Sequence, residues 1–186
     1  MSSAFAIDVP GPTLAAARAG DVRAYERIYR LFERPVFTLA LRMTGSREDA
    51  QDVLQETMLK LFARLGDFRG QCPFWGWLRQ IAVNESLMRL RRRARRDDDE
   101  ALPEEPGDEA PDTLPPAAAD AALLARALAR LPPTTRSVLW LYHAEGFTHE
   151  EIAAAMARSV SFSKSQLARG TRRLRALLGI EEPSHA

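Results

Sequence analysis

The feature that most limits how this chain can fold is an acidic, proline-rich stretch at residues 97–116. It holds nine aspartate or glutamate residues and five prolines, and it has neither lysine nor arginine. Prolines interrupt helices and clustered carboxylates repel one another, so this stretch cannot bury a core and is predicted to be a flexible linker. The chain of 186 residues is therefore expected to form two domains, one on each side of it.

The charge of the chain is distributed unevenly. The formal net charge is +1, and because the linker carries −9, the remaining residues carry +10. Arginines concentrate in two short segments, Met88–Arg96 and Arg169–Arg175. Arginine pairs with phosphate and with guanine edges, so two basic clusters indicate that the chain binds a polyanion at two places. For either cluster alone, an ordinary solvated helix face is the alternative.

Helical periodicity recurs from about residue 13 onward and strand signals are almost absent, which predicts an all-α protein. The first domain, residues 13–96, is expected to hold four helices. Asp21 is a candidate N-cap of the first helix, and Pro35 predicts the start of the second, because proline is tolerated in a first helical turn. The apolar stripe of the first helix is expected to run through Ala24, Ile28, Leu31 and Phe32.

The third helix of this domain is predicted to begin where Ser46 and Asp49 resemble a capping box. One face of this helix is apolar, and the other is acidic and rich in amides: Glu48, Asp49, Asp52, Gln55 and Glu56. Two glycines and a proline make residues 66–73 a loop. The fourth helix, 74–96, becomes polycationic in its last two turns, where positive charge complements the helix dipole.

The second domain, residues 117–180, is predicted to end in a helix-turn-helix. An Ala/Leu-rich helix begins near Ala117, and a second helix is expected at 134–145. Thr148 and Glu151 form a capping box that opens a short helix, and a cationic helix follows at 161–178, with Leu167 and Leu174 facing inward. In a helix-turn-helix the second helix fits the DNA major groove.

Several other classes of function are disfavoured. No apolar run approaches the roughly 18 residues that cross a bilayer, and Met1–Pro12 lacks the parts of a secretion signal, so a cytoplasmic protein without membrane insertion is expected. Cys72 is the only cysteine, which leaves no disulfide and no cysteine-based metal cluster. His143, His149 and His185 are too scattered for a metal site or a catalytic triad. We therefore expect no enzyme, no catalytic residue, no metal and no cofactor.

Three motifs, in this order and around a variable linker, resemble one family. They are Glu48–Leu59; Phe74–Asn84 with Arg89–Arg92; and Gly146–Ala153 with Lys164–Leu167. Together they resemble the extracytoplasmic-function (ECF) sigma factors of the sigma-70 family, over nearly the whole chain. The resemblance implies a subunit that directs RNA polymerase to promoters, with two promoter-binding domains, regions 2 and 4. It also implies three partners: bacterial core RNA polymerase, promoter DNA and an anti-sigma factor.

For region 2, the resemblance implies a polymerase-binding surface. In the family, the acidic and amide-rich helix docks on a coiled coil of the largest polymerase subunit, and carboxylates suit such a basic partner. The corresponding residues here are Asp49, Asp52, Gln55 and Glu56. From the residues alone, an ordinary solvated helix face remains the alternative.

The resemblance also implies that region 2 reads the single-stranded minus-10 element. Phe68, Arg69 and Asn84 fall where the family reads it, and an unstacked base needs an apolar pocket and an amide. Arg91 and Arg92 suit phosphates better than bases. Trp77 is expected to pack in the core rather than to stack on a base.

For region 4, the resemblance places Lys164, Ser165 and Arg169 against the minus-35 duplex, and Arg172 lies on the outward side of the same helix. The turn before this helix departs from the family pattern, because Ala157 and Arg158 stand where a glycine and an apolar residue are usual. Val160 or Phe162 is the candidate to fill the missing core position.

Two alternatives stay open at this point. One is a sigma mimic that sequesters a regulator and binds no DNA, although a mimic has no need for two phosphate-binding surfaces. The other is an autonomous helix-turn-helix regulator, although no sensor domain remains once the two helical units are assigned.

Overall fold

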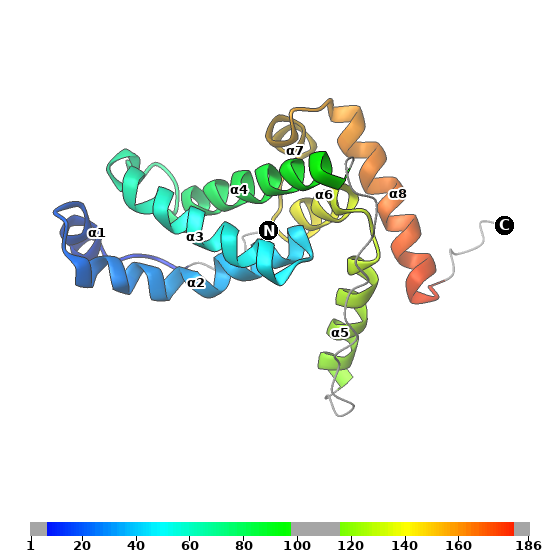
Figure 1. The fold of residues 1–186 in the computed structure, drawn as a ribbon, viewed down its shortest axis with the longest axis horizontal. Coiled ribbons are helices and arrows are strands. Elements are labelled where there is room, and N and C mark those ends of the chain that lie inside the picture. The colour runs from blue at the N-terminus through cyan, green and yellow to red at the C-terminus, as the bar shows by residue number, and fades with distance from the viewer. Residues whose placement is uncertain (1–6, 98–115, 181–186) are drawn as a thin grey trace. The chain divides into compact units, whose positions relative to one another are not determined.

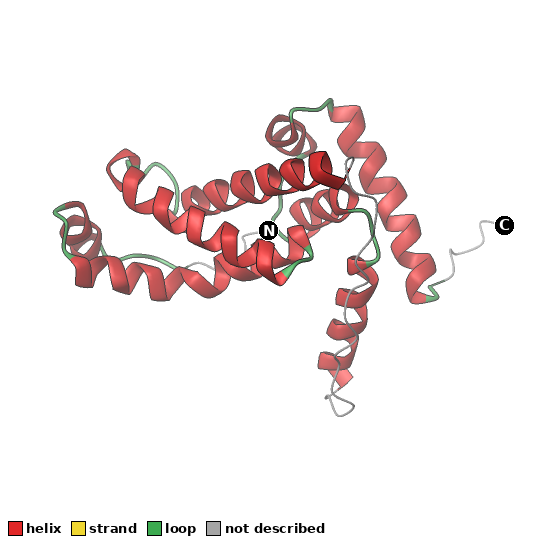
Figure 2. Cartoon of the chain, viewed as in Figure 1, coloured by secondary structure: helices red, strands yellow, loops and turns green. Residues whose placement is uncertain are grey.

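The computed structural model describes residues 7–97 and 116–180, so nearly all of the predicted acidic linker lies outside the described residues (Figure 1). The chain divides between Arg92 and Arg93 into two compact units. Within the described ranges, every regular element is a helix (Figure 2), which confirms the all-α prediction. Among these helices, none combines the length and the apolar composition that a membrane crossing requires.

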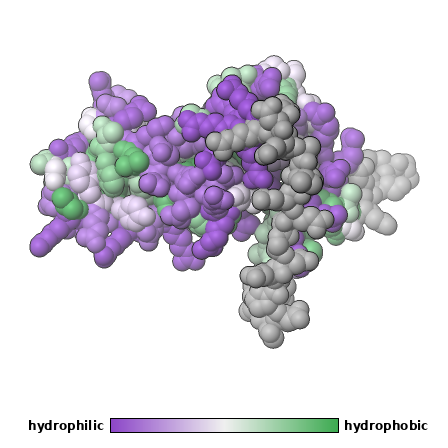
Figure 3. All heavy atoms as spheres, in the orientation of Figure 1, coloured by the Kyte–Doolittle hydropathy of each residue, from purple (hydrophilic) through white to green (hydrophobic). Residues whose placement is uncertain are grey.

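The first unit is built on a long helical hairpin. Its elements are α1 (Gly11–Arg18), α2 (Val22–Thr44), α3 (Arg47–Arg64), the short 3-10 helix η1 (Leu65–Asp67) and α4 (Phe74–Asp97) up to Arg92. Helices α2 and α3 pack side by side, while α1 contacts both α2 and η1. Gly45 turns the chain between α2 and α3 in the left-handed conformation, with φ of 74°. Hydrophilic side chains cover much of the face of this unit that Figure 3 shows.

The prediction that Pro35 starts a new helix is wrong. Helix α2 continues through Pro35, although proline removes a backbone donor and its ring crowds the preceding turn. The reason is the apolar stripe, because Ile28 and Phe32 before the proline and Leu39 after it are buried on one continuous face. Leu31, which was expected in the stripe, is exposed instead. The Asp21 N-cap is confirmed, since its carboxylate accepts from the amides of Arg23 and Ala24.

Three ion pairs join α4 to α3. Arg89 on α4 donates from Nε to Asp49 Oδ1 at 2.6 Å, and a second guanidinium nitrogen lies 2.7 Å from Asp52 Oδ2. The hydrogen bond to Asp49 is the main reason why the pKa of Arg89 lies above its ordinary value. Lys60 Nζ lies 2.5 Å from the buried carboxylate of Glu85. These charge pairs connect residues 25 to 40 positions apart in the chain and hold α4 against α3.

The second unit packs three helices on α8. It holds α5 (Pro116–Ala129), α6 (Pro133–His143), α7 (His149–Met156) and α8 (Val160–Leu178), and α8 contacts each of the others. Leu128, Leu131 and Leu139 form a core, and three half-buried residues of α8 pack against it: Leu167, Leu174 and Leu177. The capping box of Thr148 and Glu151 is confirmed. Helices α7 and α8 with their turn are the predicted helix-turn-helix.

The turn between α7 and α8 keeps the backbone conformation that glycine usually adopts, although Ala157 stands there. Ala157 takes the left-handed conformation with φ of 53° and ends α7, a conformation that costs a side-chain-bearing residue about 1 to 2 kcal/mol relative to glycine. Ser159 then caps α8 by accepting from the Phe162 amide at 3.1 Å. Val160 and Phe162 are both half-buried, so neither fills the missing core position completely. The Arg158 guanidinium lies 5.7 Å from the Phe162 ring centre.

Helices α6 and α8 lie close together at Gly170. A Cβ atom there would lie 2.6 Å from Cγ2 of Thr135 and 2.8 Å from Cδ1 of Leu139. Gly76, inside α4, has no atom within 4 Å of the corresponding position. The first glycine is therefore required by packing, and the second is not.

Gly170→Ala is expected to lower the free energy of unfolding of the second unit by about 1 to 2 kcal/mol, because overpacking outweighs the gain in helix propensity. Gly76→Ala is the control, and it should leave the stability of the first unit unchanged or raise it. Urea unfolding followed by circular dichroism and by amide exchange of each unit measures both changes. If the Gly170→Ala protein is as stable as the parent, then α6 and α8 can move apart to accommodate the methyl group without losing stability.

Arg89→Met is expected to lower the free energy of unfolding of the first unit by about 2 to 3 kcal/mol, because it removes the cation that donates to the buried Asp49 carboxylate at 2.6 Å. This expected loss of stability is smaller than the loss for a fully buried ion pair, because the Arg89 side chain is 30% exposed. Arg92→Met, on the exposed end of the same helix, should change stability by less than about 0.5 kcal/mol. Urea denaturation of both variants checks this, and a similar loss in the two would mean that the pair with Asp49 contributes nothing specific.

Candidate polymerase-binding and DNA-binding surfaces

The acidic face of α3 is narrower than the sequence indicates. Gln55 and Glu56 are exposed, and the Asp52 side chain is 46% exposed beside Arg89. Asp49 is buried at 6% and is held by the same arginine, so it does not present its carboxylate to a partner. The expectation that Asp49 belongs to the exposed face is wrong, because a helix face defined by spacing alone ignores the neighbouring helix α4.

Phe68 is a core residue of the first unit. It is 8% exposed, and its ring centre lies 5.1 Å from that of Phe74 and 5.5 Å from that of Trp77. Phe32 extends the cluster, with its ring centre 5.2 Å from that of Phe74. Phe68 is therefore placed to shape the loop from within rather than to offer an open ring to a base. Trp77 packs in the same cluster, as expected.

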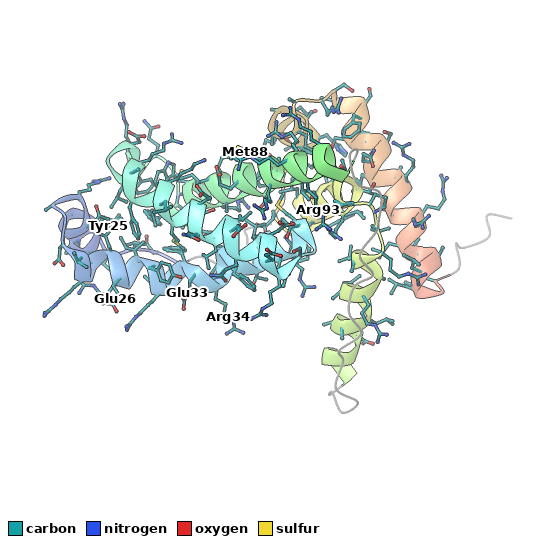
Figure 4. All side chains as sticks on the ribbon, in the orientation of Figure 1. Tyr25, Glu26, Glu33, Arg34, Met88 and Arg93 are labelled. Atoms are coloured by element: carbon teal, nitrogen blue, oxygen red, sulfur yellow. The ribbon has the colours of Figure 1, made fainter. Side chains whose placement is uncertain are left out.

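Four polar residues of the predicted minus-10 set lie on the surface: Arg69, Asn84, Arg91 and Arg92. Asn84 and Arg91 are seven residues apart on α4, so they share one side of that helix two turns apart. The Asn84 side chain accepts from Gln80 Nε2 at 3.3 Å, which leaves its amide group free to donate. Arg92 lies against the sulphur of Met88, the residue labelled on α4 in Figure 4.

Arg18 is a residue of this site that sequence reasoning missed. Its Nε donates to the carbonyl oxygen of Leu65 at 3.3 Å, and another guanidinium nitrogen donates to the carbonyl oxygen of Phe68. These bonds attach α1 to both ends of the turn that leads into Arg69. No motif marks Arg18, because its partners are backbone atoms 47 and 50 residues away.

The outer side of α8 carries the predicted minus-35 residues. Lys164, Ser165, Arg169 and Arg172 are all exposed. Arg169 donates from Nε to the Ser165 carbonyl oxygen at 3.3 Å, and the Ser165 hydroxyl donates to the Phe162 carbonyl oxygen at 3.0 Å. Ser165, Arg169 and Arg172 follow helical spacing, so they form one basic stripe.

Two family models match the chain. The model of Sigma-70 region 2 matches residues 28–96, and the model of Sigma-70, region 4 matches residues 121–174. The first match lies in the first unit apart from its last four residues, and it contains α3 and nearly all of α4. The second match lies within the second unit and contains the helix-turn-helix.

Curated relatives and a solved structure agree with these matches. The chain is 33% identical over 171 residues to the ECF RNA polymerase sigma factor SigM of Mycobacterium tuberculosis, covering 89% of this chain and 83% of that protein. It is 32% identical to the ECF RNA polymerase sigma factor SigE of Mycolicibacterium smegmatis, covering 92% of this chain and 69% of that protein.

Among solved structures, the sigma factor RpoE in complex with the anti-sigma factor NepR from Bartonella quintana shares the fold. The TM-score is 0.63 at 24% identity, covering 87% of this chain and 100% of that one. The chain matches the models of both sigma-70 regions in the expected order, and it is more than 30% identical to two ECF sigma factors over most of its length. It therefore belongs to the sigma-70 family, as an RNA polymerase sigma factor of the extracytoplasmic-function group.

Proposed function

We propose that this sigma factor, which directs RNA polymerase to specific promoters, divides its work among three surfaces. Region 2, within residues 13–96, binds core polymerase through α3 and reads the melted minus-10 element through the loop around Arg69 and through α4. Region 4, within residues 117–180, reads the minus-35 duplex through α8, and the acidic linker 97–116 joins the two. The protein performs no chemistry itself and acts in the cytoplasm, where its partners are.

The polymerase surface rests on Gln55 and Glu56, with Asp52 at its edge. Gln55 and Glu56 are adjacent exposed residues of α3, about one turn after the half-exposed Asp52, whereas the buried Asp49 is paired with Arg89. An exposed carboxylate beside an amide suits a basic partner, since the charges are complementary and the amide adds hydrogen bonds. The pairing of Asp52 with Arg89 holds its carboxylate in one place on this surface.

The proposed minus-10 surface consists of the loop around Arg69, which hydrogen bonds from Arg18 hold in place, and the exposed arginines of α4. Arg18 and the aromatic cluster around Phe68 fix the turn, so Arg69 projects from a rigid base. Asn84 has donors to address a base edge, and Arg91 and Arg92 are exposed where they can neutralise phosphates of the same strand. Phe68 supports this surface from the core and is not expected to stack on a base.

The minus-35 surface is the exposed stripe of α8, and this stripe in a helix-turn-helix is the single observation that carries DNA recognition. Residues at the N-terminal half of a recognition helix reach base edges, so Lys164, Ser165 and Arg169 are assigned to bases. Arg172 and Arg173 lie further along the helix, where phosphates are closer. An anti-sigma factor is a further proposed partner, because RpoE of Bartonella quintana has this fold in complex with one.

No specific observation favours a sigma mimic or an autonomous regulator. Cations are exposed on both units, which a mimic has no need for, and the two family models leave no separate sensor domain among the described residues.

Run-off transcription with core polymerase tests the polymerase surface. The chain is expected to support transcription from its promoters, and Glu56→Arg should lower its affinity for core polymerase by at least about tenfold, because like charges brought together cost several kcal/mol. Glu26→Arg is the matched control: it makes the same charge change on α2 (Figure 4), where the carboxylate is 55% exposed. Circular dichroism should show both variants folded. Identical affinities of the two would remove α3 as the docking surface.

Selection of duplexes from a randomised minus-35 pool tests the assignment on α8. Arg169→Ala is expected to relax base preference at one position, at a cost of about 1 to 3 kcal/mol in discrimination. Arg173→Ala should weaken binding to all sequences alike, because it removes only a phosphate contact. A motif that shifts for Arg173→Ala and stays the same for Arg169→Ala would mean that the turn at Ala157 has rotated α8 away from the register proposed here.

A further inference from the structure

A basic depression lies within the second unit, between the ends of α6 and α7 and the side of α8. Its volume is about 350 Å³, and five of its lining side chains are basic or can become so: His143, His149, Lys164, Arg172 and Arg175. The remaining lining residues are small or apolar, and none of the described lining residues is acidic. Such a site attracts an anion and repels a metal cation.

His149 is the best-fixed residue of the depression. Its Nδ1 lies 3.0 Å from the hydroxyl of Ser163, which is wholly buried. Its ring also stacks on Tyr142, with ring centres 4.8 Å apart and planes inclined by 23°. A hydrogen bond and a ring stack together hold the imidazole in one orientation. Because Nδ1 is engaged by Ser163, Nε2 is the nitrogen left to contact a ligand.

We propose that this depression binds a backbone phosphate of the minus-35 duplex, with His149 donating from Nε2, and that region 4 therefore holds promoter DNA more tightly as the pH falls. The inference rests on the proposed function, since Lys164 and Arg172 border both the depression and the DNA-reading stripe. A phosphate fits this lining because a protonated imidazole and the two cations can each donate a hydrogen bond to its oxygens.

The charged groups around His149 determine the direction of the pH effect. Helix α6 presents Tyr142 and His143, and α8 presents Ser163, Lys164, Arg172 and Arg175. On α7 itself, Glu150 is exposed and Glu151 accepts from the Thr148 amide at 2.7 Å. Glu145, before α7, accepts from Trp140 Nε1 at 3.2 Å. The charged side chains that line the depression beside His149 are all basic, so an anionic phosphate is the complementary partner that we propose, and DNA binding is then expected to weaken as the pH rises.

Fluorescence anisotropy of the full chain with a minus-35 duplex, at pH 6 and at pH 8 and constant ionic strength, tests the proposal. The parent protein is expected to bind about three- to tenfold more tightly at pH 6, as one charge-assisted hydrogen bond implies. His149→Gln should abolish most of this ratio, because glutamine can donate a hydrogen bond to the phosphate but cannot take up a proton. Arg173→Ala, outside the depression, should weaken binding at both pH values and keep the ratio.

A His149→Gln protein that is folded and retains the parental ratio would overturn the proposal. If the parent protein does not bind the duplex at either pH, the proposed minus-35 function itself fails, and this outcome is distinct from a failure of His149 alone.

Proton NMR of the His149 ring in the parent protein gives a test that needs no variant. The resonance is expected to move on addition of the duplex. Movement with inorganic phosphate and none with the duplex would show a site for a free phosphate compound, and would overturn the assignment to DNA.

Discussion

The guanidinium of Arg89 is the contact on which the arrangement of the first unit depends. It reaches from α4 to two carboxylates of α3, at 2.6 Å for Asp49 and 2.7 Å for Asp52. Because Asp49 is buried, losing the arginine would remove a charge partner from a carboxylate that water reaches poorly. On α3, Glu48, Gln55 and Glu56 stay exposed and Asp52 is half-exposed, and on α4 the exposed arginines begin at Arg91.

The loop that precedes α4 is held by aromatic packing and by hydrogen bonds to its backbone rather than by ion pairs. Aromatic rings fill it from within, and Arg18 satisfies two of its carbonyl groups from α1. Loops usually move more than the elements they connect, and a site on a loop is accurate only when the elements around it hold it. Arg69 therefore lies at the edge of a rigid structure, although the residue itself is exposed.

In the second unit, the positions of the helices depend on backbone geometry at two residues, Gly170 and Ala157. Gly170 allows α6 to approach α8, and the left-handed Ala157 turns the chain between α7 and α8. Helix α8 thus contributes Leu167, Leu174 and Leu177 to the core on one side while its arginines stay exposed on the other. One helix serves stability and recognition together, so changes on its inner side are expected to affect DNA binding indirectly.

The amino-acid sequence by itself determined the features that depend on near neighbours along the chain. Caps at Asp21 and Thr148, the helical spacing of apolar residues and the helix-turn-helix follow from interactions three or four residues apart, which can be read directly from the sequence. The family motifs were readable for the same reason, since each is a short continuous segment.

Only the tertiary structure decided which of the predicted site residues are available to a partner. Asp49 and Phe68 are withdrawn from the surface by residues 40 and 6 positions away in the chain, and Arg18 acts on carbonyl groups about 50 positions away. Pro35 shows the same principle, because the burial of one continuous stripe outweighed a local rule that would have divided α2. Burial and charge pairing depend on which segments meet in space, and spacing along one helix carries no information about the helix that packs against it.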